Sequence, residues 1–257
     1  MLYVQQLSVY ILTCNSPKYL SDILARCSTF ADEIVIVDSG STDNTLAIAR
    51  SFNCRIFYRP LDNFREQRQF AHNCCTNQWV LAIDSDEIPA DELIKELQQL
   101  KADGFKYDAY KIQRRWNVLG KWVHGLIPVP SPDYPIRLLN KNKVVFDQRS
   151  TRSHETAHGY DTLGVIEAPL LHYTFETRAE LESKLQLYSR LRAEDIIESG
   201  KSTGLLQLLL SPIGAWFKWY IVRGNWQDGY VGLTLAYFAM RYTYHKYRIA
   251  RQLKKQQ

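Results

Sequence analysis

The sequence of 257 residues lacks several common signatures, and each absence removes a class of protein. Its five cysteines form no CxxC pair and are odd in number, which argues against a disulfide scaffold or a zinc site and favours a reducing compartment. No GxGxxG follows the first predicted strand and no Walker A lysine motif occurs, so neither a dinucleotide-binding domain nor a P-loop is expected. Residues 1–10 have no charged n-region and no long apolar core, so we expect no secretory signal.

Long apolar runs are also missing, as are acidic residues near the C-terminus. The nearest approach to a membrane span, Leu205–Val222, is interrupted by polar residues, which favours an interfacial helix over a spanning one. The net charge is +5, and after Asp228 the chain has Lys and Arg but no Asp or Glu. This basic tail indicates binding to an anionic surface, either a membrane or a nucleic acid. The alternative is a helix end that is simply solvated.

Short apolar runs alternate with helical patterns along the first part of the chain, which is typical of an α/β fold. The strands are expected at Leu7–Leu12, Glu33–Asp38, Cys54–Tyr58 and Trp79–Ile83, and the helices at Tyr19–Thr29, Leu46–Phe52 and Phe64–Asn77. The order predicts a mainly parallel sheet flanked by helices. Further along, the sequence predicts helices at Ala90–Lys101 and Arg178–Ser199, strands at Tyr107–Gln113 and Val144–Phe146, and a long binding loop at Trp116–Tyr134.

Three carboxylates, Asp84, Asp86 and Glu87, directly follow the predicted strand Trp79–Ile83. Like charges this close repel one another, and burying them without partners costs free energy. A divalent cation takes oxygen ligands and bridges to phosphates, so it is one way to neutralise them. The alternative is a solvated acidic turn in which Asp86 or Glu87 caps the helix that begins near Pro89.

Polar residues follow two other predicted strands. Thr13 and Asn15 come after the first strand, and Asp38 ends the second. Because open parallel sheets bind ligands at the carboxyl edge of their strands, these side chains are expected to converge with Asp84 and Asp86 on one crevice.

Large side chains recur every three or four residues toward the C-terminus and predict one stripe along a helix. They are Tyr230, Leu233, Tyr237, Met240, Tyr244 and Tyr247. Arg241, Arg248 and Lys255 repeat every seven residues on an adjacent face. An aromatic stripe beside basic residues favours peripheral contact with an anionic membrane. The alternative is a helix packed back on the domain, with a soluble basic end.

Three segments together resemble family 2 glycosyltransferases of the GT-A fold. They are Leu12–Asn15, Ile34–Thr45, and Gln67–Arg68 leading into Trp79–Glu87, in which Asp84-Ser85-Asp86 has the form of the family's DxD motif. The second half is similar to lipopolysaccharide-core glucosyltransferases of the WaaE/KdtX type. The similar segments are Arg137–Leu139, His154–Glu155, Leu171–Tyr173 with the long helix after it, and Asp228-Gly229. The first loop departs from the family, since Thr13–Ser16 stands where TKNE is usual.

The resemblance implies a donor site for a nucleotide-sugar, with UDP-glucose as the expected donor. In it, Asp38 reads the uracil or ribose, and Thr13 and Asn15 line the same pocket. Arg68, with Arg65 as a weaker candidate, pairs with uracil or phosphate oxygens. The alternative for Asp38 is a helix N-cap, a role that fits Asp43 better.

The resemblance also implies a divalent cation, Mg²⁺ or Mn²⁺, held against the diphosphate by Asp86 and Asp84, where it acts as a Lewis acid. Asp86 is the stronger candidate for direct ligation, because Asp84 also suits the ribose or a metal-bound water. His172 approaches the metal or diphosphate, or else is a buried histidine bonded to backbone. Glu87 is either an acid at the N-terminus of the following helix or a residue that contacts the metal ligands without binding the metal.

Glu155 is the expected general base, and Asp147 is the competing candidate. His154 would orient Glu155. By resemblance, the displacement inverts the anomeric centre. Trp116, Trp122 and His124 lie in the predicted loop, where aromatic faces can stack on an acceptor sugar or belong to the core.

The expected organisation is a GT-A domain over residues 1–200 and a C-terminal amphipathic, membrane-associating helical region over 201–257. Within the domain, residues 1–104 form the nucleotide-binding half and 105–177 the acceptor and catalytic half. We expect an inverting, metal-dependent hexosyltransferase that acts on a lipid A-core glycolipid, peripherally at the inner face of the cytoplasmic membrane, with no nucleic-acid partner. The alternatives are transfer to another lipid-linked or capsular glycan and, in a different class, a non-catalytic protein that binds lipid or nucleic acid.

Overall fold

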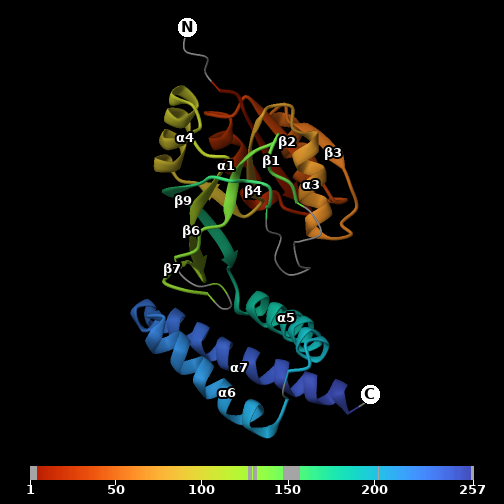
Figure 1. The fold of residues 1–257 in the computed structure, drawn as a ribbon, viewed down its shortest axis with the longest axis vertical. Coiled ribbons are helices and arrows are strands. Elements are labelled where there is room, and N and C mark those ends of the chain that lie inside the picture. Colours follow the sequence, from red (N-terminus) through yellow and green to blue (C-terminus); the bar gives the residue numbers. More distant parts are fainter. Residues whose placement is uncertain (1–4, 127–128, 130–131, 147–156, 202, 256–257) are drawn as a thin grey trace. The chain divides into compact units, whose positions relative to one another are not determined.

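The computed structural model describes residues 5–126, 129, 132–146, 157–201 and 203–255. Its first part alternates strands and helices as the sequence predicts (Figure 1). The strands are β1 (Leu7–Thr13), β2 (Glu33–Asp38), β3 (Arg55–Tyr58) and β4 (Trp79–Asp84), and the helices are α1 (Pro17–Cys27), α2 (Thr45–Ser51) and α3 (Phe64–Cys74). β1, β2 and β4 are buried along nearly their whole length, which is why they read as continuous apolar runs.

Local sequence explains where these helices begin. In α1, Pro17 occupies the first turn, where its missing N–H costs nothing, and Leu20, Ile23, Leu24 and Cys27 form the buried face. In α3, the Asn63 side chain accepts a hydrogen bond from the backbone N–H of Glu66, which satisfies one of the free donors at the helix start.

The described strands form a nine-stranded sheet in the order β3-β2-β1-β4-β8-β6-β9-β5, with β7 paired to β6. The first four are parallel, and β8 joins β4 in the antiparallel sense. The remaining elements are β5 (Glu87–Pro89), α4 (Asp91–Asp103), β6 (Ala109–Val118), β7 (Lys121–Val123), β8 (Ile136–Asn140) and β9 (Leu163–Phe175). The predicted α/β fold is thus confirmed as a mixed, mostly parallel GT-A-like sheet flanked by helices.

The sequence prediction was wrong for one strand of the second half. Val144–Phe146 was predicted as a strand, but its one described bridge joins Val145 to His158. The strand that pairs with β4 is β8, which lies earlier in the chain. Val144 and Phe146 are nevertheless buried in a core cluster, and a short apolar run does not distinguish a strand from such a segment. The predicted long loop begins with a hairpin, in which Trp116 pairs with Val123.

C-terminal helices follow β9: α5 (Arg178–Glu198), α6 (Leu205–Phe217), the π-helical turn η1 (Lys218–Val222), the 3₁₀ turn η2 (Asn225–Asp228) and α7 (Gly229–Lys254). One helical stretch of the described residues, Leu205–Val222, is long and apolar enough to cross a membrane by length and composition. Core helices of soluble proteins and signal sequences can pass the same test.

The chain divides into two compact units. Unit 1 comprises Met1–Arg114 and Tyr134–His172, and unit 2 comprises Arg115–Asp133 and Tyr173–Gln257. In unit 2, α7 packs its buried residues against α5 and the β6–β7 hairpin. These two units are not divided at residue 200, where the sequence analysis placed its domain boundary. The expected domain boundary therefore stays a prediction.

Candidate functional site

The carboxyl ends of β1, β2 and β4 meet at one edge of the sheet in unit 1. The register pairs Thr13 with Asp38 and Leu12 with Asp84. Residues far apart in the sequence therefore lie side by side at this edge, as expected for a parallel sheet.

Asp38 organises the loop that follows β2. It is 2% exposed, and it accepts hydrogen bonds from the backbone N–H groups of Gly40 (2.9 Å) and Ser41 (2.8 Å) and from the hydroxyls of Ser41 (2.5 Å) and Thr13 (2.9 Å). Burial alone would raise the pKa of Asp38, but these hydrogen bonds outweigh it and lower the pKa. Asp43, by contrast, accepts from the backbone N–H and hydroxyl of Thr45, the first residue of α2, although the N-cap position itself is Asn44.

Asn15 completes the same edge from the loop after β1. Its φ of 49° places it in the left-handed region, which Asn tolerates better than most residues. Its backbone N–H donates to the Ser41 hydroxyl (2.8 Å), and its side-chain oxygen accepts from the Thr42 N–H (2.9 Å). The next residue, Ser16, shares a 3.1 Å hydrogen bond with Ser85. Thr13, Asn15 and Asp38 are thus held together beside the acidic turn.

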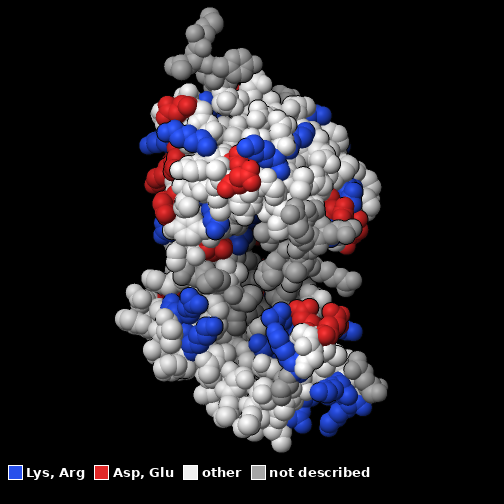
Figure 2. All heavy atoms as spheres, viewed as in Figure 1, with Lys and Arg blue, Asp and Glu red and all other residues white. Residues whose placement is uncertain are grey.

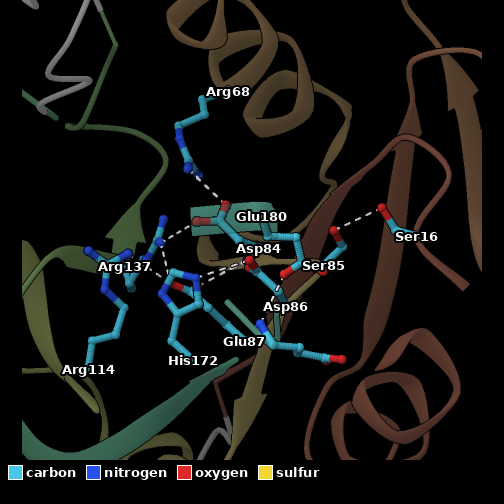
Figure 3. Close-up of polar contacts among 11 residues, drawn as sticks. Ser16, Arg68, Asp84, Ser85, Asp86, Glu87, Arg114, Arg137, His172 and Glu180 are labelled. Carbon is cyan, nitrogen blue, oxygen red and sulfur yellow. Dashed lines mark hydrogen bonds and ion pairs between the residues drawn. The ribbon is translucent and has the colours of Figure 1, made fainter. Parts of the chain in front are cut away.

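Asp84 is held by two arginines (Figure 3). Arg68 Nη2, from α3, donates to Oδ1 (2.8 Å), and Arg137 Nη2, from β8, donates to Oδ2 (2.5 Å). Each oxygen therefore already has a cationic partner. The sequence suggested that Arg68 pairs with the nucleotide, and in the structure it donates to Asp84.

Glu87 is fully buried and also meets arginine. Its Oε1 accepts from Arg137 (2.6 Å) and Arg114 (3.1 Å), and its Oε2 accepts from the Asp84 backbone N–H (3.0 Å). Burial would raise the pKa of both Asp84 and Glu87, but the charge of Arg137, supported by Arg114, lowers both below their ordinary values. The two carboxylates are therefore charged at neutral pH.

Asp86 differs from its two neighbours because its side chain is 41% exposed. His172 Nε2, from β9, lies 3.1 Å from Asp86 Oδ2, and His172 Nδ1 lies 3.8 Å from Glu87 Oε1. The antiparallel pairing of β5 and β9 sets Glu87 opposite His172 and so fixes the imidazole at the acidic turn. Asp86 is the carboxylate of the three that is most available to a ligand.

The residues present fit a divalent cation that also takes oxygens from its substrate. No group of three or more His, Cys, Asp or Glu side chains suitable for a metal ion occurs among the described residues. Mg²⁺ in nucleotide sites, however, is commonly held by one or two carboxylates together with substrate phosphates and water. Asp86 offers one such carboxylate, and His172 lies 3.1 Å from it.

The structure brings together the predicted residues Thr13, Asn15 and Asp38, and likewise Arg68, Asp84, Asp86 and His172. Sequence reasoning missed the role of Arg137 and Arg114 as partners of the buried acids. A signal existed, since three clustered acids favour nearby positive charge and Arg137 lies in a family-like segment, but no local pattern linked Arg137 or Arg114 to the acidic turn. Glu155, His154 and Asp147 lie outside the described residues, so their predicted roles stay predictions.

Solved structures similar to this chain support the fold. Glucosyl-3-phosphoglycerate synthase from Mycobacterium tuberculosis, in complex with phosphoglyceric acid, matches with a TM-score of 0.51 at 16% sequence identity. The match covers 77% of this chain and 81% of that one. The same enzyme with Mn²⁺, UDP-glucose and phosphoglyceric acid matches with a TM-score of 0.50.

Sequence comparisons show the family. The model of glycosyl transferase family 2 matches residues 8–155. The lipopolysaccharide core biosynthesis glycosyltransferase LpsC of Rhizobium meliloti is 31% identical over 236 residues, covering 88% of this chain and 84% of that protein. An uncharacterized glycosyltransferase of Rickettsia felis is 26% identical over 242 residues, covering 89% of this chain and 83% of that protein. The chain therefore belongs to glycosyl transferase family 2 and is a nucleotide-sugar-dependent glycosyltransferase.

Proposed function

We propose that the protein transfers glucose from UDP-glucose, with inversion and with a divalent cation, onto the inner core of lipopolysaccharide or lipooligosaccharide. The observation that carries the acceptor is the similarity to LpsC, which is named for lipopolysaccharide core biosynthesis. The donor and metal are supported by the structurally similar synthase, whose complex contains UDP-glucose and Mn²⁺. Family membership favours this enzyme over a non-catalytic lipid- or nucleic-acid-binding protein.

The donor site is proposed at the edge formed by β1, β2 and β4. Asp86 and His172 would hold Mg²⁺ or Mn²⁺, and the bound cation would neutralise the diphosphate and stabilise the departing nucleotide. Thr13, Asn15 and Asp38 would line the pocket for uracil and ribose, with Asp38 acting through the loop that it holds.

Asp84 is proposed as a positioning group, because its oxygens are occupied by Arg68 and Arg137. Arg68 remains a candidate for binding the nucleotide. Its hydrogen bond to Asp84 orients the guanidinium at the proposed donor site. Glu155 is proposed as the general base that takes the proton of the acceptor hydroxyl, in a displacement that inverts the anomeric centre.

Transfer is tested with the purified chain, Mn²⁺, a set of UDP-sugars and a deacylated or intact core glycolipid. We expect UDP release to require the glycolipid and to be fastest with UDP-glucose. The measurement is coupled UDP release, with the product's anomeric configuration read by NMR. UDP release that requires a capsular or other lipid-linked glycan would favour the runner-up acceptor and contradict the lipopolysaccharide assignment.

We propose that unit 2 attaches the enzyme peripherally to an anionic membrane, at the inner face of the cytoplasmic membrane. The predicted stripe on α7 has exposed members, with Tyr230 at 64% and Tyr237 at 53%, because a different set, including Leu235, Phe238 and Tyr242, packs against the rest of unit 2. Arg241, expected to face lipid headgroups, instead forms two hydrogen bonds to Glu182 of α5.

The larger apolar surface lies on α6. Its exposed leucines include Leu206 (70%) and Leu210 (58%), and Figure 2 shows a broad uncharged area over the C-terminal helices with Lys and Arg beside it. Between Glu198 and the C-terminus Asp228 is the sole acidic residue, and it is 2% exposed. An apolar face with cations and no exposed carboxylate complements an anionic lipid surface.

Replacing Leu206 and Leu210 together with glutamate is expected to weaken binding to anionic vesicles at least about tenfold, because two exposed leucines that would enter the lipid are lost and two negative charges are added. Co-sedimentation with phosphatidylglycerol-containing vesicles measures this. The matched control is the double change Leu187→Glu and Leu191→Glu on α5, where the exposed leucines have the same spacing. Equal binding of the two double variants, or resistance of the wild type to carbonate extraction, would contradict peripheral attachment through α6.

A further inference from the structure

Unit 2 contains an imidazole–carboxylate pair that the donor site does not use. His124 Nδ1 lies 2.6 Å from Asp228 Oδ1, and the His124 backbone N–H donates to Asp228 Oδ2 (2.9 Å). The Asp228 side chain is 2% exposed, whereas that of His124 is 52% exposed. A buried carboxylate thus fixes the imidazole through Nδ1, and the opposite edge of the ring, with Nε2, is left for a ligand.

The segment around His124 is clamped at several points. Lys121 Nζ donates to the Asp228 carbonyl oxygen (3.0 Å), and Asn225 Nδ2 donates to the Gly125 carbonyl oxygen (3.1 Å). Asn225 is 1% exposed. A Cβ at Gly232 would lie 1.7 Å from the Asn225 carbonyl oxygen, so glycine is needed for η2 to pack on α7. The segment is therefore pre-organised, which reduces the entropy cost of binding a ligand.

Asp228 holds this segment instead of its own helix. It occupies the N-cap position of α7, where an aspartate usually accepts from a backbone N–H of the first turn. Its side chain makes no such capping bond, and both oxygens accept from His124 instead. Asp228 therefore fixes both the backbone and the ring of His124 at the start of α7.

The segment carries several hydrogen-bond donors and the Trp122 ring, which Arg115 and Tyr173 already contact. Residues 115–129 contain no Asp or Glu, but include Arg115, Lys121 and His124. The Arg115 guanidinium lies 5.5 Å from the centre of the Trp122 ring. Indole faces stack on sugar rings, and cationic donors bind carboxylate and phosphate oxygens. A neutral sugar needs hydrogen-bond acceptors as well as donors from its binding site. The charged side chains of this segment are donors and include no carboxylate acceptor.

We propose that the clamped segment Arg115–Gly125 binds an anionic group of the acceptor, a carboxylate or phosphate carried by a saccharide. His124, fixed by Asp228 through Nδ1, presents its Nε2 edge to the anion, Lys121 supplies a cation, and Trp122 borders the sugar ring. The assignment of the ligand as an acceptor rests on the proposed function, whereas the recognition of an anionic sugar rests on the segment itself.

The site is tested by NMR on the full chain with labelled histidine, using glucose 6-phosphate, glucuronate and glucose as probes. We expect saturable shifts of the His124 resonance, assigned by its loss in His124→Gln, with one or both anions and none with glucose. The two anions distinguish phosphate from carboxylate recognition. Lys121→Gln is expected to raise the dissociation constant about tenfold, whereas Lys184→Gln, an exposed lysine on α5, should leave it within twofold.

Kinetics separate this proposal from the proposed function. His124→Gln is expected to raise KM for the glycolipid about tenfold while KM for the UDP-sugar stays unchanged, which a general loss of structure would not produce. Absence of a saturable shift with either anion, or an equal shift with glucose, would overturn the site. Shifts with the anions, but no UDP release with the core glycolipid, would instead overturn the proposed acceptor and leave the anionic-sugar site supported.

Discussion

Replacing Asp86 with asparagine is expected to lower kcat/KM at least about 100-fold, because the change removes the exposed carboxylate while keeping its size. The same variant should lose the stabilisation that UDP and Mn²⁺ together give the wild type in a thermal-shift measurement. Neutral asparagine is a weaker ligand for a hard cation than carboxylate is.

The matched control is Glu92→Gln, which removes a charge from an exposed position on α4 of the same unit. It should behave as the wild type in both measurements. Chelation of the metal should reduce the wild type toward the level of Asp86→Asn. If Asp86→Asn keeps wild-type activity and its metal-dependent response to UDP, Asp86 does not hold the cation.

Replacing Arg137 with methionine is expected to lower the free energy of unfolding by about 2–4 kcal/mol at pH 7, since Asp84 and Glu87 each lose a charged hydrogen bond. Each keeps one other arginine, Arg68 for Asp84 and Arg114 for Glu87. The affected charges are those of Asp84 and Glu87, each within 2.6 Å of Arg137. Methionine fills a similar volume without the guanidinium. Urea unfolding measures the difference, and Arg50→Met on α2, where the arginine is exposed, should cost less than about 0.5 kcal/mol.

The pH dependence of Arg137→Met gives a second measurement. In the wild type the folded pKa values of Asp84 and Glu87 lie below their ordinary values. Their contribution to stability is therefore present above the unfolded pKa, about 4, and is lost as the pH falls through the folded values. The variant should show a smaller loss of stability below about pH 5. A wild-type pH profile, with less than 1 kcal/mol lost at pH 7, would contradict the proposed ion-pair network.

The arginines that contact Asp84 and Glu87 change the interpretation of the acidic turn after β4. From the sequence, a metal ion was one way to neutralise Asp84, Asp86 and Glu87, and a solvated turn was the other. In the structure, Glu87 is fully buried and Asp84 is paired, and both are matched by guanidinium groups. Neither alternative describes these two residues. The metal proposal now concerns Asp86, with His172 beside it.

The helix at the C-terminus illustrates a different limit of prediction. The spacing of Tyr230, Leu233 and Tyr237 correctly indicated a helix, but α7 also carries Leu235, Phe238 and Tyr242 at helical spacing. Only packing against the rest of unit 2 distinguishes the two sets, and it buries the second. A helix apolar on much of its circumference does not by itself say which face its neighbours cover.

The sequence by itself determined the α/β order of the first part, the convergence of Thr13, Asp38 and Asp84 at one sheet edge, and the family resemblance. These depend on local period and on the rule that parallel strands end at a common edge. Only the tertiary structure decided which charges meet there. Arg68, Arg137 and His172 reach the acidic turn from α3, β8 and β9. Such partners depend on strand pairing between distant segments, which no local pattern encodes.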